Sequence, residues 1–299
     1  MRIFFFAFDC LRIHSKIWKQ VLQTNPIFYE SHMHTPLCKH AMGMPEDYAE
    51  VAYRRGLKGI IVTCHNPMKN GWSSNVRMDL NQLDEYVTIV EHAQQTWNDK
   101  IDVRLGLESD YVPDIESWLE ELHQIEEFHY ILGSVHPHLQ YYKDLYFSGN
   151  ILAFQRVYFE HLAMAAETKL FDTLSHPDLV KSVDPLEWNV GRIAEDICKC
   201  LDRVAATGVA MELNTSGLHK SVPEMNPGRF MLEEMHKRNI PVVVGADAHH
   251  PYRVAANFEE ALDTLSDVGY TKVSIFLNRE RCDLGIDEVR SSLFPAEPC

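Results

Sequence analysis

Histidines and isolated carboxylates give this sequence its most obvious chemistry. His32 and His34 are two residues apart, a spacing that in extended backbone points both imidazoles to the same side. Asp247 and His249 repeat the spacing near the other end of the chain, and Glu108 closes an apolar run. A carboxylate in such a place must face solvent or a cation, because burying it unpaired is costly. The pattern predicts a metal site.

Four further histidines are candidate ligands because of where they occur. His65, His136 and His176 each follow an apolar run directly, and His40 lies in the loop after the first run. Taken alone, each could be an ordinary surface or core histidine, and Asp247 could cap a helix. Together they complete a nitrogen and oxygen ligand set that suits zinc, manganese or iron: His32, His34, His40, His65, Glu108, His136, His176, Asp247 and His249.

Nine ligands are too many for one ion, so we expect two or three divalent transition-metal ions (Zn, Mn or Fe). A water molecule that bridges such ions is acidified towards neutral pH and becomes a competent nucleophile. The expected chemistry is hydrolysis by this activated water.

The elements that must position these ligands alternate in type from Ile27 onward. Short apolar runs and longer helical patterns predict parallel strands joined by helices. The expected strands are 27–31, 59–63, 103–107, 130–134, 171–175, 209–213 and 241–245, and the expected helices include 78–96, 115–128, 154–169, 190–206 and 227–238. Seven such units predict an α/β fold with a closed or nearly closed TIM-like (β/α)7 barrel. Active sites of such barrels lie at the carboxyl ends of the strands, where the candidate ligands and Asn214 occur.

The composition of the chain excludes some classes of binding partner and of fold. The 299 residues are 45% hydrophobic, which is ample for a core, and the 43 acidic and 28 basic side chains give a net charge of -15. This charge argues against nucleic acid as a partner. Seven cysteines without Cys-x-x-Cys spacing argue against a disulfide framework or a zinc ribbon, and indicate a reduced, cytoplasmic protein.

One catalytic domain is expected between two short flanking segments. We assign residues 1–27 to a non-catalytic N-terminal extension, residues 28–290 to the barrel and residues 291–299 to a C-terminal tail. The apolar run Ile3 to Phe8 is too short to span a bilayer. A signal peptide is the alternative, but no small-residue cleavage site follows, so neither export nor membrane attachment is expected.

Seven motifs that contain the candidate ligands occur in one order along the chain. They are Glu30-Ser31-His32-Met33-His34-Thr35 with Lys39-His40-Ala41, Thr63-Cys64-His65, Gly106-Leu107-Glu108, Gly133-Ser134-Val135-His136, Ser175-His176-Pro177-Asp178, Glu212-Leu213-Asn214-Thr215-Ser216-Gly217-Leu218 and Gly245-Ala246-Asp247-Ala248-His249. In these motifs the chain resembles the polymerase and histidinol phosphatase (PHP) superfamily of metal-dependent phosphoesterases, specifically its histidinol-phosphatase branch. The resemblance covers nearly everything after residue 27.

The resemblance implies a distorted barrel of seven strand-helix units with three metal ions. One ion would take His32, His34, Glu108 and Asp247. A second would share Glu108 and add His136 and His176. A third would take His40, His65 and His249.

The resemblance also implies groups that handle the substrate. Arg156 and Lys220 are candidates to clamp the phosphate, and Asn214 is a further candidate for substrate binding. His219 stands where relatives often have arginine, and its protonated imidazole could donate to phosphate or to the leaving oxygen. Glu108, Asp247 and His219 are therefore the expected catalytic residues.

A metal-dependent phosphomonoester hydrolase is the function that this resemblance implies, and L-histidinol phosphate, an intermediate of histidine biosynthesis, is the expected small-molecule substrate. An acidic rim of Asp110, Tyr111 and Glu224 would favour its cationic groups, and Glu30 would support the ligands from behind. The alternatives are another phosphomonoester such as a nucleotide or sugar phosphate, a non-catalytic metal-binding barrel, or a carbon-nitrogen hydrolase. Members of the last class typically use a bridging lysine where this chain has Glu108.

Overall fold

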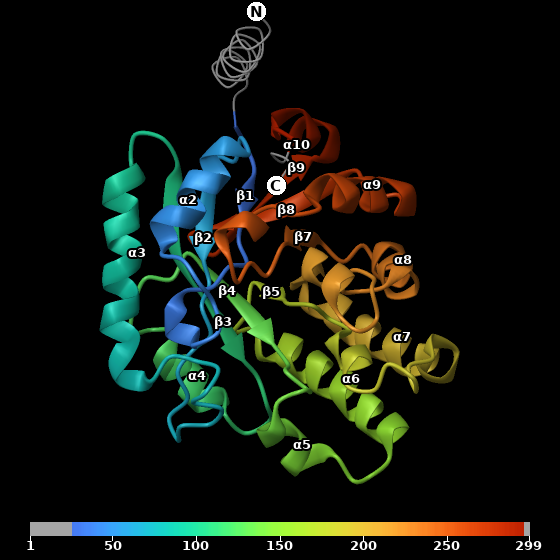
Figure 1. Ribbon diagram of the computed structural model, residues 1–299. Helices are drawn as coiled ribbons and strands as arrows, with labels where there is room; N and C mark the ends of the chain where they lie inside the picture. Colours follow the sequence, from blue (N-terminus) through green and yellow to red (C-terminus); the bar gives the residue numbers. More distant parts are fainter. Residues whose placement is uncertain (1–25, 296–299) are drawn as a thin grey trace, which may run out of the picture.

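The computed structural model describes residues 26–295 (Figure 1). The expected extension of residues 1–27 therefore lies outside the described residues, apart from Pro26 and Ile27. Close packing begins at Phe28, whose side chain is fully buried. Within residues 26–295, no helix is both long and apolar enough to cross a membrane.

Seven parallel strands form one sheet in the order of the sequence. They are β1 Tyr29–Glu30, β2 Gly59–Val62, β3 Asp102–Asp110, β4 Tyr130–Ser134, β5 Thr173–Leu174, β6 Ala210–Asn214 and β7 Val242–Gly245. The register places Glu108 of β3 opposite Leu132 of β4. Beyond the ends of β1 and β7, Met33 forms a parallel bridge with Ala248, and the sheet thereby curls into a nearly closed barrel.

Helices follow most of the strands and surround the sheet (Figure 1). The α-helices are α2 Pro45–Arg54, α3 Leu83–Trp97, α4 Glu116–Leu122, α5 Gln140–Tyr146, α6 Ile151–Thr168, α7 Val190–Thr207, α8 Arg229–Lys237, α9 Phe258–Val268 and α10 Ile286–Ser292. The 3-10 helices are η1 Pro36–Cys38, η2 Leu80–Gln82, η3 Leu179–Ser182, η4 Thr215–His219 and η5 Pro251–Arg253. In α7 the buried residues Ile193, Ile197, Leu201 and Val204 recur at helical spacing, so one stripe faces the barrel. The amide of Gly191 donates to its N-cap residue Asn189.

The predicted barrel of seven parallel strands is confirmed, but the lengths of its elements differ from the prediction. Strand β3 continues to Asp110, because the amide of Glu108 donates to Cys64 and the carbonyl of Glu108 accepts from Asn66. Glu108 therefore lies inside a strand instead of after one. Strands β1 and β5 have only two paired residues each.

A hairpin that the sequence patterns did not predict lies at the amino-terminal end of the barrel. It consists of β8 Lys272–Leu277 and β9 Glu280–Gly285, paired antiparallel. At its turn, the amide of Arg279 donates to the carbonyl of His129, and the Arg279 side chain lies 2.5 Å from Asp172. His129 and Asp172 immediately precede β4 and β5, so the hairpin covers the end opposite to the candidate ligands.

The predicted boundary of the C-terminal tail, residues 291–299, lies too early in the chain. Leu293 and Phe294 are buried, and the amide of Phe294 donates to the carbonyl of Arg55. The packed domain thus reaches Phe294 because two apolar side chains close the core beneath α2.

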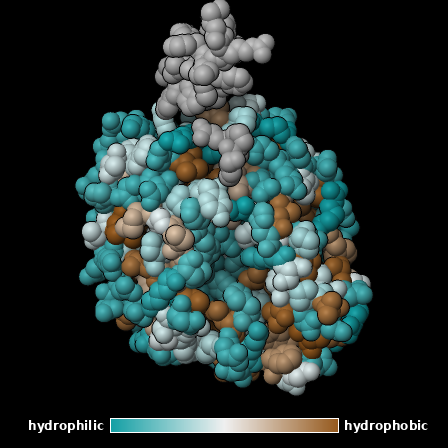
Figure 2. Space-filling model, in the orientation of Figure 1, coloured by the Kyte–Doolittle hydropathy of each residue, from teal (hydrophilic) through white to brown (hydrophobic). Residues whose placement is uncertain are grey.

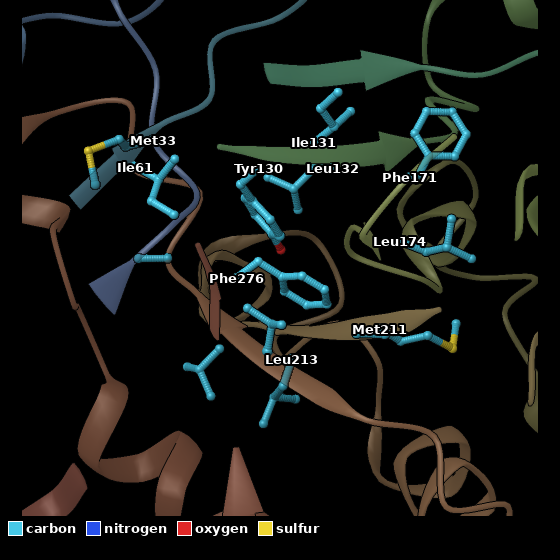
Figure 3. Packing of buried hydrophobic residues seen from close by; sticks show 14 of the residues in the cluster. Met33, Ile61, Tyr130, Ile131, Leu132, Phe171, Leu174, Met211, Leu213 and Phe276 are labelled. Carbon is cyan, nitrogen blue, oxygen red and sulfur yellow. The ribbon is translucent and has the colours of Figure 1, made fainter. Parts of the chain in front are cut away.

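Aliphatic and aromatic side chains from different strands meet inside the barrel (Figure 3). The ring of Tyr130 from β4 stacks on that of Phe276 from β8, with centroids 5.5 Å apart. Ile61 and Leu213 belong to the same cluster. The visible outer surface is mostly hydrophilic, with hydrophobic residues in small separate groups (Figure 2).

One lysine is buried in the loops that follow β5 and β6. Nζ of Lys181 donates to Asp178, to Glu224 and to the carbonyl of Met225 at 3.0, 3.1 and 2.8 Å, and its side chain is fully buried. Breaking such a buried pair leaves an uncompensated charge in the interior. Lys181 therefore fixes two loops at the carboxyl-terminal face of the barrel.

We expect Lys181→Met to lower the free energy of unfolding by about 3–5 kcal/mol, because Asp178 would keep a buried charge without its cation. The control is Lys199→Met, since Lys199 is 68% exposed and pairs with an exposed glutamate; it should change stability by about 0.5 kcal/mol at most. Urea unfolding followed by circular dichroism measures both. Equal stability of the two variants would contradict a structural role for Lys181.

Candidate metal centre

All nine predicted ligands lie at the carboxyl ends of the strands or in the loops that leave them. Two follow β1, one lies in the β1 to α2 loop, one follows β2, one lies in β3, one each follow β4 and β5, and two follow β7: His32, His34, His40, His65, Glu108, His136, His176, Asp247 and His249. Parallel strands of a barrel bring these positions to one face. The structure brings the whole predicted set together.

Glu108 is the centre of this set and is completely buried. Its Oε1 lies 3.1, 3.4 and 3.5 Å from the Nε2 atoms of His176, His136 and His32. Its Oε2 lies 2.6 Å from Nδ1 of His65. The two oxygens thus face different imidazoles, which is the arrangement that a carboxylate bridging two cations requires.

Asp247 faces the ligands with one oxygen and the open side with the other. Oδ1 lies 3.2 and 3.5 Å from the Nε2 atoms of His34 and His32. Oδ2 accepts from Oγ of Ser216 at 3.1 Å and lies 3.5 Å from Nζ of Lys220. The backbone of Asp247 has a φ of 50°, a left-handed conformation that is costly outside glycine and clusters at functional sites.

His40 and His249 approach each other at the exposed edge of the centre. Nδ1 of His40 donates to the carbonyl of Cys38 at 2.7 Å, and Nδ1 of His249 donates to that of Asp247 at 3.0 Å. Both Nε2 atoms are then acceptors in the neutral rings, yet they lie 2.9 Å apart. A cation between two such lone pairs removes their repulsion. The ring of His65 completes this group, with its centroid 5.5 Å from that of His40.

Several buried polar atoms around Glu108 have no hydrogen-bond partner within residues 26–295. They are Nε2 of His32, both ring nitrogens of His34, Nδ1 of His65 and Oε2 of Glu108. The 2.6 Å contact between His65 and Glu108 lacks hydrogen-bonding geometry, so proximity alone does not satisfy either atom. Unpartnered buried polar atoms are rare in folded proteins. Since these are all ligand atoms for transition metals, the residues fit metal ions.

Glu212 supports two ligands from behind. Nδ1 of His32 donates to Oε1 at 2.7 Å, and the amides of His176 and of the Asn214 side chain each donate to Oε2 at 2.9 Å. Because Nδ1 of His32 carries the proton, its Nε2 is free to bind an ion. Gly245 is required beside this pair, since a Cβ atom there would lie 2.0 Å from Oε1 of Glu212.

Asp110 supports His136 in the same way. Nδ1 of His136 donates to Oδ1 of Asp110 at 2.9 Å, and a guanidinium nitrogen of the buried Arg77 lies 2.5 Å from Oδ2. Arg77 is itself fixed by the carbonyl and side-chain oxygens of Asn66. Burial would lower the pKa of His136, but the charges of Asp110 and Glu108 outweigh it and raise this pKa to about 10.

Glu30 has the supporting position expected of it. Its fully buried carboxylate accepts from the amides of His32, Ala246 and Ala255 at 3.0, 3.1 and 3.1 Å. These bonds join the segment after β1 to the segment after β7. Burial raises the pKa of Glu30 to about 7, against the opposing effect of the three amides.

The electrostatics of the centre are those of a cation site. Burial would raise the pKa of Glu108, but the imidazoles of His65, His32 and His136 hold it well below its usual range. Conversely, the carboxylates of Glu212, Asp247 and Glu108 outweigh burial and hold the pKa of His32 well above its usual value. Binding divalent ions would displace such protons from the imidazoles.

A cavity of about 600 Å³ opens above the ligands. Six of the nine ligands line it, with polar groups of Arg77, His138, Ser182, Ser216 and Lys220 and apolar groups of Val76, Leu139 and Leu179. Its volume is in the range of small-molecule sites. A polar, ligand-rich floor and a partly apolar wall allow one small substrate to be held against the metal centre.

The structure brings only one of the four expected substrate-binding residues to this cavity. Lys220 lines it, whereas Asn214 lies beneath it and donates to Glu212. His219 is exposed outside the lining residues, because η4 ends there and turns its side chain to solvent. The prediction that Arg156 clamps the phosphate is wrong. Its side chain is 52% exposed on α6 and pairs with Asp196 of α7.

The prediction that Asp110, Tyr111 and Glu224 form an acidic rim at the site is also wrong. Asp110 is buried between Arg77 and His136, and Tyr111 is buried and donates to Glu116. Glu224 accepts from Lys181. Each of the three groups is committed to a structural partner, so none is free for a substrate cation.

Arg77, Asp110 and Glu212 are the functional positions whose roles sequence reasoning missed. Glu212 lies in a quoted motif two residues before Asn214, and Asp110 follows Glu108 by two, so strand alternation could have indicated both. Arg77 gives no such signal, because it lies in a long loop between β2 and α3 and reaches Asp110 only through the tertiary fold.

The fold and the centre define a class: metal-dependent hydrolases built on an α/β barrel, with histidine and carboxylate ligands at the strand ends. Comparison with known proteins specifies it further. Residues 30–216 match the PHP domain. A probable histidinol-phosphatase of Deinococcus radiodurans is 35% identical over 247 residues, which cover 80% of this chain and 93% of that protein. The chain belongs to the PHP domain family.

A second curated relative and a solved structure are also similar to this chain. The histidinol-phosphatase of Bacillus subtilis is 25% identical over 264 residues, covering 78% of this chain and 98% of that protein. In the solved structures, histidinol phosphate phosphatase from Lactococcus lactis, complexed with zinc, L-histidinol and phosphate, has the same fold with a TM-score of 0.73. That likeness covers 86% of this chain and all of that chain at 18% identity.

We expect Glu212→Gln to weaken metal binding by roughly 10–100-fold, because an amide would leave one of the two supported ligands misoriented. Metal content after dialysis against a buffered series of free zinc concentrations measures this. Glu187→Gln is the control, since Glu187 is exposed and pairs with surface Arg192. Unchanged zinc retention in the Glu212 variant would show that His32 does not need this support.

Proposed function

We propose that this protein is a histidinol-phosphatase that hydrolyses the phosphomonoester of L-histidinol phosphate, with two to three divalent transition-metal ions held around Glu108. The observation that carries the proposal is Glu108 itself, whose two buried oxygens face different imidazoles. Three of these imidazoles, of His65, His136 and His176, line a cavity of about 600 Å³. The curated relatives that bear the name of this activity match along most of the barrel.

The ions would supply Lewis-acid activation of water and neutralise the phosphate charge when bound. His32, His34, Glu108 and Asp247 would hold the first ion, Glu108, His136 and His176 the second, and His40, His65 and His249 the third. Glu212 and Asp110 fix the donor nitrogens of His32 and His136. These supports keep the ligands in one geometry before the substrate arrives.

Lys220 is the cavity residue best placed to bind the phosphate. Its Nζ lies 3.5 Å from Oδ2 of Asp247 and faces the cavity from the side of η4. Oγ of Ser216 donates to the same oxygen, so both groups lie next to a proposed ligand. The apolar side chains of Val76, Leu139 and Leu179, which line the same cavity, would contact the imidazole ring of the substrate.

Glu108→Gln is expected to abolish phosphatase activity while the fold is kept, because an amide cannot bridge two cations at the same volume. The measurement is release of inorganic phosphate from L-histidinol phosphate, compared with a nucleotide monophosphate and a sugar phosphate. Glu120→Gln, on the exposed side of α4, is the control and should match the parent. If Glu108→Gln retained more than about a tenth of turnover, only about 1.4 kcal/mol of transition-state stabilisation would be lost and the bridging role would be wrong.

Lys220→Ala should raise KM for L-histidinol phosphate roughly tenfold or more, since a hydrogen bond to a charged group contributes about 1.5–3 kcal/mol. His219→Ala, which alters the neighbouring exposed residue, should leave KM unchanged. Steady-state kinetics at saturating zinc compare the two, with metal content measured in parallel. A larger effect of the His219 change would reverse these assignments.

A further inference from the structure

A long loop between β2 and η2 supplies part of the cavity lining. Residues 63–79 contain no helix, and their one β-bridge joins His65 to Glu108. Loops longer than about 12–15 residues without secondary structure of their own are uncommon in compact domains and often have a function. Val76 and Arg77 of this loop line the cavity, so the position of the loop affects the shape of the substrate site.

The connection after β4 supplies a second part of the lining. His138 and Leu139 line the cavity, and α5 begins at the next residue. The ring of Tyr141, in the first turn of α5, stacks on the ring of Trp72 from the long loop, with centroids 3.7 Å apart and an angle of 27° between the planes. Both side chains are half-buried and pack against the core. Trp72 and Tyr141 therefore join the two parts of the chain that supply Val76 and Leu139.

This aromatic pair lies next to the cavity without lining it. A narrow void is bordered by Trp72 and Tyr141, and it shares Arg77, His136 and Leu139 with the lining of the cavity. Neither aromatic ring is among the side chains that line the cavity itself. An effect of either ring on a bound substrate would therefore be transmitted through neighbouring side chains such as Leu139.

Other contacts of the loop leave its outer part dependent on the aromatic pair. At the side of the metal centre, the buried guanidinium of Arg77 is fixed by Asp110. Further out, the side chain of Lys39 donates to the carbonyl of Ser74 at 2.5 Å, but this lysine is exposed. A hydrogen bond at an exposed site replaces one to water and contributes little net stability, whereas stacked aromatic rings contribute beyond the area that they bury. The aromatic pair is therefore the contact that attaches this part of the loop to α5.

We propose that Trp72 and Tyr141 are positioning residues, which fix the distance between Val76 and Leu139 and thereby select the substrate by its ring-bearing end. The inference rests on the proposed function, because it uses the proposed contact of Val76 and Leu139 with the imidazole ring of L-histidinol phosphate. Such apolar contacts are made equally in the ground state and in the transition state, so their loss raises KM and leaves kcat unchanged.

Steady-state kinetics of the zinc-loaded, full-length protein tests the selection of substrate. Trp72→Ala should raise KM for L-histidinol phosphate roughly 3–10-fold, the scale of a lost aromatic stack, and should change kcat less than about twofold. The inhibition constant of inorganic phosphate, which has no ring, should not change. Trp72→Phe keeps a stacking ring and should restore most of the parental affinity.

Two further variants separate a pairwise effect from general damage to the site. Tyr141→Ala should raise KM as Trp72→Ala does, and the double variant should be no worse than either single variant, because each change removes the same interaction. The control is Trp97→Ala, which removes a ring that packs against Tyr53 between α3 and α2 and should match the parent. Additive losses in the double variant, or an equal rise in the inhibition constant of phosphate, would overturn the inference.

Limited digestion with trypsin measures the attachment of the loop without an activity assay. The side chain of Lys69 in the long loop is 65% exposed, so cleavage after this residue reports how often the loop opens. Cleavage there should be roughly 3–10-fold faster in Trp72→Ala and in Tyr141→Ala, and unchanged in Trp97→Ala. Parental cleavage rates in both stack variants would contradict the positioning role. Should the parent release no phosphate from L-histidinol phosphate, the proposed function and the substrate selection would both fail, while the digestion would still decide whether the stack holds the loop.

Discussion

A buried carboxylate that must be balanced by cations is the constraint on which this molecule depends. Glu108 lies in the longest strand with no exposed surface, and five imidazoles come within 3.6 Å of its two oxygens. An isolated carboxylate there would be unfavourable by many kcal/mol, and would become protonated instead. The imidazoles hold its pKa low, but they are themselves proposed ligands of the metal ions. The buried carboxylate and the surrounding imidazoles are therefore stable together only when bound protons or metal ions balance the negative charge of Glu108.

The barrel meets this constraint by fixing the ligands from behind. Glu212 and Asp110 each accept from a ligand Nδ1, and Glu30 joins the segments after β1 and β7. Backbone strain accompanies this precision, since the ligands His176 and Asp247 have φ values of 27° and 50°. Such conformations persist where surrounding bonds over-determine them. Rigid strands, closed by a hairpin at the opposite end, provide that support.

The net charge of the chain and the charge of the groups at the cavity have opposite signs. The chain carries a net charge of -15, which would repel a phosphate anion at long range. The cavity instead offers Lys220 and buried Arg77 beside sites for divalent ions, whose local charge dominates at short range. A substrate that combines a phosphate with cationic groups suits this division.

The barrel and the nine proposed ligands could be predicted from the sequence, because strand periodicity and the placement of histidines and carboxylates after strands are local properties. Which residues reach the cavity depends instead on the tertiary fold. Arg156 and Lys220 have the same charge in the sequence, yet one pairs with Asp196 on the outer surface and the other lines the site. Likewise, the partners that hold His136, namely Asp110 and Arg77, come from separate segments. Long-range contacts depend on how helices and loops pack in three dimensions, and no local pattern encodes that packing.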